Sequence, residues 1–94
     1  MSRKKPSPDR FVGLDVHKHY LIAAAVDPNR KEVMSPQRVP LVHLDDWVCK
    51  SLSPQDAVVL EMTTNAYQLY DDLLPHVYSV TVVHPPHVAL ITRA

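Results

Sequence analysis

The sequence predicts an α/β domain built on one mixed β-sheet, and three observations support this. Three apolar segments with short polar connections come first, which is the pattern of an antiparallel meander. Two amphipathic segments follow, and each leads to another apolar segment, as helical crossovers do between parallel strands. The length of 94 residues, with 46% hydrophobic and 21% charged residues, suits a single small globular domain.

The meander is predicted over residues 11–39. Phe11–Asp15 and Tyr20–Val26 are apolar runs, and the segment VHKH between them has the length of a hairpin connection. The next connection, residues 27–31, reads DPNRK and combines three residue types that favour turns. Glu32–Val39 alternates loosely between apolar and polar residues, so we expect it to pair back as a third antiparallel strand.

After Pro40 the apolar residues change to helical spacing, which predicts a helix near residues 41–52. Acidic residues near its start and Lys50 near its end suit the helix dipole. Ala57–Leu60 is a continuous apolar run, the pattern of a strand that is covered on both faces. The second half of the chain therefore begins with a helix and a buried strand.

A second helix is predicted from Ala66 to Leu74, where Asn65 and Gln68 resemble a capping box and Pro75 ends the helix. Ser79–Val83 is rich in β-branched residues and predicts a fifth strand. The prolines after it break regular structure, and residues 88–94 could begin a third helix.

The predicted order is therefore β-β-β-α-β-α-β, which is the order of the ribonuclease-H-like fold, incomplete at the C-terminus. In such a mixed sheet the first strand is central and the fourth lies parallel beside it. Asp15 closes the first predicted strand and Glu61 closes the fourth. Because ligands bind beyond the carboxyl ends of parallel strands, we expect both carboxylates at one functional edge of the sheet.

Two neighbouring carboxylates repel each other unless a cation lies between them. Their hard oxygen ligands suit Mg²⁺ or Mn²⁺, and a pair of such ions can assist phosphodiester cleavage. We therefore interpret Asp15 and Glu61 as catalytic metal ligands. The alternative is that Asp15 caps a turn and Glu61 satisfies donors of the following helix.

The first ten residues carry four cations and no apolar run, which predicts a flexible basic arm over residues 1–10 and a domain over residues 11–94. Arg3, Lys4, Lys5 and Arg10 could contact a phosphate backbone in a salt-sensitive, sequence-independent way. A solvated tail is the alternative.

The net charge is zero, so no global electrostatic attraction draws the chain to nucleic acid or to an anionic membrane. The basic start lacks the hydrophobic segment of a signal peptide, and no apolar stretch approaches the roughly twenty residues that span a bilayer. Cys49 is the only cysteine and suits a reducing compartment, so a cytoplasmic location is expected without membrane contact.

Further residues near the two acids could bind nucleic acid. Lys18 follows the first strand and could hold a phosphate, although a solvated turn lysine is an equal alternative. A helix N-terminus at Thr63, Thr64 and Asn65 could also hold a phosphate, or these residues could only cap the helix. The six histidines and one cysteine lack the spacing of a structural zinc site.

The segments GLDVHK, VVLEMTTNAYQLYDDL and VTVVHPPHV, in this order, resemble the N-terminal RuvC-like domain of the DEDD insertion-sequence transposases. The resemblance covers residues 11–94 and implies a catalytic domain for DNA transposition and recombination. It implies Mg²⁺ or Mn²⁺ as cofactor, DNA and a guide (bridge) RNA as partners, and a homo-oligomer at full length. Carried over to this sequence, Asp15 is the first acid of the catalytic tetrad and Glu61 is the second.

The sequence departs from the family after the fifth strand. The resemblance places the last two acids in segments like Lys-Thr-Asp and Asp-Ala, whereas no acid follows Asp72 here, and the C-terminal domain with its serine is missing. We therefore expect a truncated fragment that does not cut or join DNA alone.

Two other classes of protein stay open. An actin-like or sugar-kinase domain would need a glycine-rich phosphate loop, but Gly13 is the only glycine. A non-catalytic interaction module would instead use an exposed edge or face of the sheet.

Overall fold

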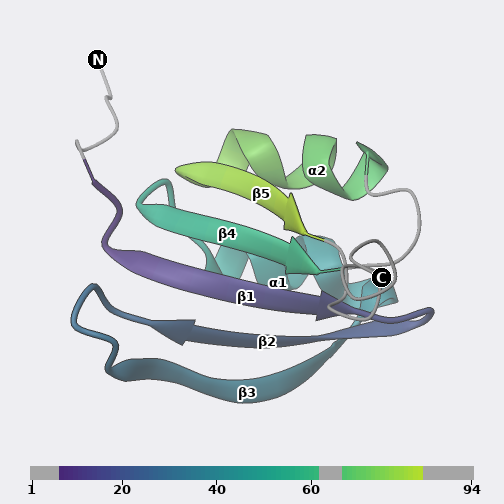
Figure 1. Cartoon of the computed structure of the whole chain (residues 1–94). Helices are drawn as coiled ribbons and strands as arrows, with labels where there is room; N and C mark the ends of the chain where they lie inside the picture. The colour runs from purple at the N-terminus through teal and green to yellow at the C-terminus, as the bar shows by residue number, and fades with distance from the viewer. Residues whose placement is uncertain (1–6, 62–66, 84–94) are drawn as a thin grey trace, which may run out of the picture.

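The structure is a computed structural model that describes residues 7–61 and 67–83. It contains one five-stranded mixed sheet with two α-helices packed against it, as Figure 1 shows. Neither helix in the described segments is long and apolar enough to cross a membrane. The strands are β1 (Arg10–Val16), β2 (Tyr20–Val26), β3 (Glu32–Pro40), β4 (Asp56–Glu61) and β5 (Ser79–Val83), and the helices are α1 (Leu44–Ser51) and α2 (Tyr67–Leu73).

The strands lie in the order β3-β2-β1-β4-β5, with β1 at the centre (Figure 1). β1, β2 and β3 form an antiparallel meander, whereas β4 runs parallel to β1 and β5 runs parallel to β4. The predicted mixed sheet with a meander followed by two helical connections is thus confirmed. The α1 connection leads from the edge strand β3 to β4, and the α2 connection leads from β4 to β5. Both run toward the β5 edge, so right-handed crossovers bring both helices to the same face.

The helix-covered face of the sheet carries the core. Alternate strand residues such as Val12, Leu14 and Leu60 are at most 1% exposed, and they pack with Leu44, Val48 and Leu73 from the helices. The other face is open among the described residues. Its side chains include Phe11 at 42% exposure and Val59 at 37%. The prediction that β4 is covered on both faces is therefore wrong for the described structure, because both helices lie on one side.

The hydrophobic pattern located most elements correctly. β2 and β5 have the predicted bounds, and β1, β3 and β4 extend beyond the predicted runs by one or two residues. The first predicted helix begins as a 3₁₀ turn, Leu41–His43, before α1. α2 ends at Leu73, before Pro75, as predicted. Pro75 itself lies in a second 3₁₀ turn, Leu74–His76, since a proline near the start of a turn removes no needed donor.

The predicted capping box stays a prediction, because one of its two residues is not described. Asn65 lies outside the described residues, as do residues 84–94 with the predicted third helix. The side chain of Gln68 donates to Asp72 Oδ1 at 2.9 Å, one turn further along α2. The Gln68 side chain therefore joins two positions of the same helix face, as i,i+4 pairs do.

Arg10 joins the amino ends of β1 and β4. Arg10 is predicted to belong to the arm, but it is the first residue of β1 and pairs in register with Asp56. Its Nε and Nη2 atoms donate to the two carboxylate oxygens of Asp56, each at 2.8 Å, and Nη2 also donates to the Ser51 carbonyl at 2.7 Å. Arg10 is therefore a structural residue and not a free cation of the arm.

Asp56 is the one buried charged residue among the described residues, at 1% exposure. Besides Arg10 it accepts a hydrogen bond from the backbone of Ser53 at 2.8 Å, so its carboxylate is well satisfied. The hydrogen bond and the charge of Asp56 raise the pKa of Arg10 above its ordinary value, and the partial burial of Arg10 opposes this. The bidentate pair and the Ser53 contact together form what we call the Arg10–Asp56 clamp.

We predict that Arg10→Ala lowers the free energy of unfolding by about 2–3 kcal/mol, because it leaves the buried Asp56 carboxylate without its cation. Urea unfolding of the unchanged chain and of Arg10→Ala measures the difference in the free energy of unfolding. Lys50→Ala is the matched control, since Lys50 pairs with Asp46 at 3.1 Å on the exposed surface of α1. Lys50→Ala should lower the free energy of unfolding by only a few tenths of a kcal/mol. Equal losses in the two variants would contradict a structural role for the clamp.

Candidate functional site

Asp15 and Glu61 are register partners at the carboxyl ends of β1 and β4. Adjacent strands lie about 4.8 Å apart, and residues paired across them point to the same face. Leu14 and Leu60, which precede the two acids, are buried toward the helices at 1% and 0% exposure. The two carboxylates therefore project from the open face at one rim of the sheet, side by side as the predicted strand order required.

The two acids are accessible to solvent and to a ligand. The side chain of Asp15 is 53% exposed, and Glu61 is partly exposed. No group of three or more Asp, Glu, His or Cys residues that could hold a metal occurs within residues 7–61 and 67–83. The rim thus offers a pair of carboxylates, which suits Mg²⁺ because this ion keeps several waters and uses one or two protein carboxylates. A structural zinc site would need four protein ligands.

His17 is an immediate neighbour of Asp15. Its Nε2 atom donates to Asp15 Oδ2 at 3.2 Å, and both side chains are substantially exposed. The imidazole also stacks on the ring of Tyr20, with ring centroids 4.7 Å apart and an interplanar angle of 23°. The sequence analysis considered His17 only for zinc, although the two-residue spacing from Asp15 already places both on one face of an extended segment.

Arg38 extends this cluster across the sheet. It lies on β3, and its guanidinium carbon is 4.0 Å from the centre of the Tyr20 ring, a cation–π contact. Ile22 is the register partner of both Asp15 and Arg38, so these three residues share one row on the open face. Local sequence pattern does not point to Arg38, because only the pairing of β2 with β3 brings it near the acids.

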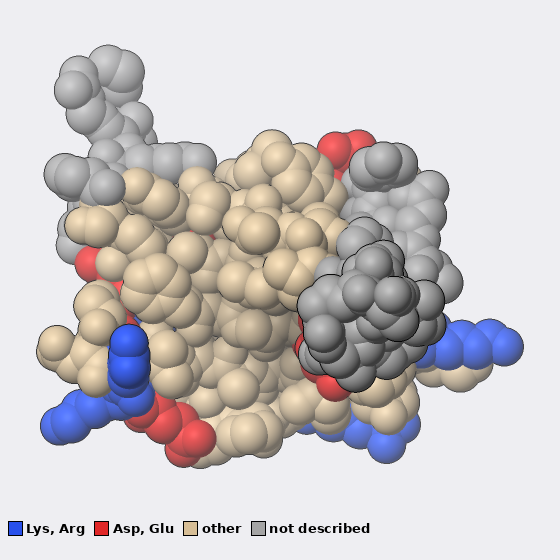
Figure 2. All heavy atoms as spheres, viewed as in Figure 1, with Lys and Arg blue, Asp and Glu red and all other residues tan. Residues whose placement is uncertain are grey.

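The remaining predicted binding residues are only partly described. Lys18 is exposed in the connection between β1 and β2, as expected for either a phosphate contact or a solvated turn. Lysine and arginine side chains project from this end of the sheet in Figure 2, with acidic side chains nearby. The other predicted contacts lie outside the described residues, namely Arg3, Lys4, Lys5, Thr63, Thr64 and Asn65.

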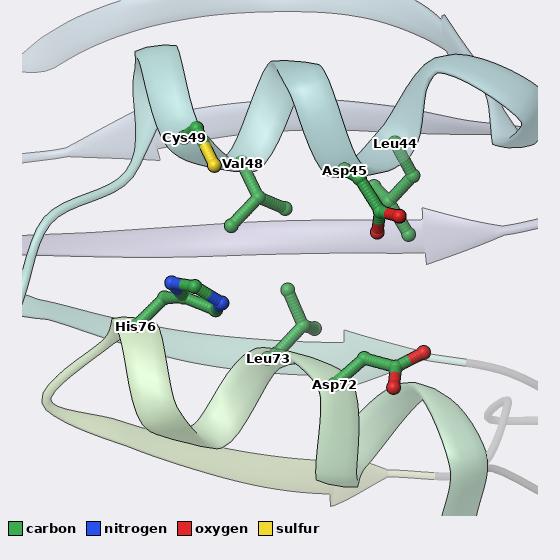
Figure 3. A pocket seen from close by; sticks show the side chains of 7 residues that line it. All are labelled: Leu44, Asp45, Val48, Cys49, Asp72, Leu73 and His76. Atoms are coloured by element: carbon green, nitrogen blue, oxygen red, sulfur yellow. The ribbon is translucent and has the colours of Figure 1, made fainter.

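A small groove of about 70 Å³ separates α1 from α2 on the helix side of the sheet. Figure 3 shows Cys49 across from His76 and Asp45 across from Asp72, with Leu73 and Val48 between them. Within the described chain these polar groups form no cluster able to hold a metal. This groove lies on the opposite side of the sheet from Asp15 and is separate from the candidate site.

Comparison with known proteins gives no independent assignment. No family model matches the sequence, and no curated protein matches it significantly. The geometry of the rim and the motifs in the sequence are therefore the basis for a functional assignment.

In metal-free solution we predict that Glu61→Gln leaves the free energy of unfolding unchanged or raises it by a few tenths of a kcal/mol, because like charges on paired strands destabilise a sheet. Urea unfolding in the presence of EDTA measures this. Asp45→Asn, at an exposed acid of α1, is the control. A loss above about 1 kcal/mol would indicate instead that Glu61 is a structural cap.

Proposed function

We propose that this chain is the front part of a ribonuclease-H-like catalytic domain of a DEDD-type DNA transposase. Asp15 and Glu61 would be the first two metal ligands of its active site. DNA would be the substrate, with a guide RNA as a further partner and assembly into a homo-oligomer at full length. A cytoplasmic location would suit the single cysteine, Cys49, which favours a reducing compartment.

The topology supports this proposal. The β3-β2-β1-β4-β5 order and the β-β-β-α-β-α-β element order are those expected of a ribonuclease-H-like sheet, with the first strand central and the fourth parallel to it. The segment GLDVHK occupies the end of β1 and the following connection, and VVLE ends β4. The motifs that carry the family resemblance therefore meet at the carboxyl ends of adjacent parallel strands.

The observation that carries the proposal is the register pairing of Asp15 with Glu61. An acid at either strand end alone could cap a turn. Two acids that face each other on an open surface at a strand-end rim are better explained by a cation held between them.

The two carboxylates would hold Mg²⁺ or Mn²⁺, which in this chemistry activates the attacking group and stabilises the leaving oxygen of a phosphodiester. The chain's own contribution is to fix the two oxygen donors on adjacent rigid strands. His17 contributes by orienting the carboxylate of Asp15, whose Oδ2 accepts a hydrogen bond from His17 Nε2 at 3.2 Å. The chain supplies two of the four acids that the resemblance implies, so we expect cation binding without DNA cleavage.

We predict that Mg²⁺ binds the chain at the rim formed by Asp15 and Glu61. Asp15→Asn should weaken Mg²⁺ binding by about tenfold or more, because it removes one of the two carboxylate ligands. Isothermal titration calorimetry measures the affinity. Glu61→Gln should give a similar loss, because both acids would contribute oxygen donors.

Asp45→Asn is the matched control for calorimetry, since Asp45 lies on α1 on the other side of the sheet. Magnesium affinity equal in Asp15→Asn, Glu61→Gln and the unchanged chain would refute the metal-site proposal.

A non-catalytic interaction module is the second candidate, and the open sheet face favours it. Phe11, Val59 and Val83 are 37–42% exposed on this face, and Val33 on β3 is 48% exposed. Indifference to Mg²⁺, together with dimerisation at micromolar concentration in sedimentation measurements, would support this function over the transposase site.

A further inference from the structure

A ladder of three side chains crosses the open face beside the carboxylate pair. His17 follows β1, Tyr20 begins β2 and Arg38 lies on β3. The Tyr20 ring contacts the imidazole of His17 and the guanidinium of Arg38. His17 comes from the β1 side of β2 and Arg38 from the β3 side. We call these three residues the Tyr20 ladder. It connects the acidic rim at Asp15 to an exposed cation on the edge strand.

The guanidinium of Arg38 is held in place while its hydrogen-bond donors stay available. Arg38 is exposed, and within the described part of the chain its guanidinium makes the ring contact with no hydrogen bond or ion pair. Arg10, by contrast, uses its donors on Asp56 and Ser51. A guanidinium that lies over a ring keeps its N–H groups at the edge, where they can bind a phosphate in a bidentate way.

The ladder suits a phosphate better than a nucleobase. A base binds by stacking on a free aromatic face, but the Tyr20 ring is already contacted by His17 and Arg38. The group of the ladder that can bind a ligand is the positively charged guanidinium of Arg38. Lys18, in the connection between β1 and β2, is a second exposed cation nearby. Such contacts follow a sugar–phosphate backbone and read no sequence.

We propose that Arg38, positioned by Tyr20, binds the phosphodiester backbone of a DNA strand that crosses the open face next to Asp15 and Glu61. The inference rests on the proposed function, since it names the path of the substrate past the metal site. Arg38 is two strands from Asp15, or about 10 Å.

The test measures fluorescence anisotropy of a labelled single-stranded DNA of mixed sequence, as a function of potassium chloride concentration. The unchanged chain is compared with Arg38→Gln, and all titrations are done both with Mg²⁺ and with EDTA. Arg30→Gln is the matched control, because Arg30 is an exposed arginine in the turn at the opposite end of β2.

We expect Arg38→Gln to weaken DNA binding about three- to fivefold at low salt, and to reduce the slope of log affinity against log salt by about 0.7. Arg30→Gln should leave both quantities unchanged. Tyr20→Phe should bind like the unchanged chain, since it keeps the ring. Tyr20→Leu should lose part of the affinity because the guanidinium is no longer held in place.

Several results would overturn the inference. The first is an absence of DNA binding, and the second is an equal slope of log affinity against log salt in Arg38→Gln and Arg30→Gln. The third is that a single-stranded RNA binds more strongly than the DNA and loses the same affinity in Arg38→Gln. The EDTA titrations separate this inference from the metal site. If Arg38→Gln weakens DNA binding in EDTA as well, and Asp15→Asn does not change Mg²⁺ affinity, the phosphate contact at Arg38 is retained and the proposed function is rejected.

Discussion

The parallel pairing of β1 with β4 is the constraint on which the candidate site depends. The Arg10–Asp56 clamp fixes this pairing at the amino ends of both strands, with bonds of 2.8 Å around a buried carboxylate. The register then runs without interruption from Arg10 and Asp56 to Asp15 and Glu61. A slip of one residue would turn every side chain of one strand to the other face and separate the two acids. A structural ion pair at one end of the sheet thus positions the Asp15–Glu61 pair at the other.

The placement of both helices on one face has a second consequence. Among the described residues it leaves the opposite face uncovered, and the acids, the Tyr20 ladder and several apolar side chains lie together there. Gly13 is part of this face, and a Cβ atom added there would meet no heavy atom within 4 Å among the described residues. Packing in the described structure therefore does not require glycine at this position.

Hydrophobic periodicity was sufficient to predict the elements, their order and the two acids at the strand ends. It located Tyr20–Val26 and Ser79–Val83 with their observed bounds, because short β-branched and apolar runs between turn residues leave little choice. It could not predict the role of Arg10, since a charge in a basic N-terminal segment becomes structural only through Asp56, 46 residues away. The contact of Arg38 with Tyr20 was missed for the same reason, because it depends on the register of β3.

Paramagnetic broadening by Mn²⁺ in ¹H–¹⁵N NMR spectra tests most directly whether positions 15 and 61 share one cation. The account predicts that, at the lowest Mn²⁺ concentrations, the amide signals at the ends of β1 and β4 broaden together and before all others. Broadening that centres on the groove around Asp45 and Asp72, or that affects the end of one strand without the other, would contradict a shared site.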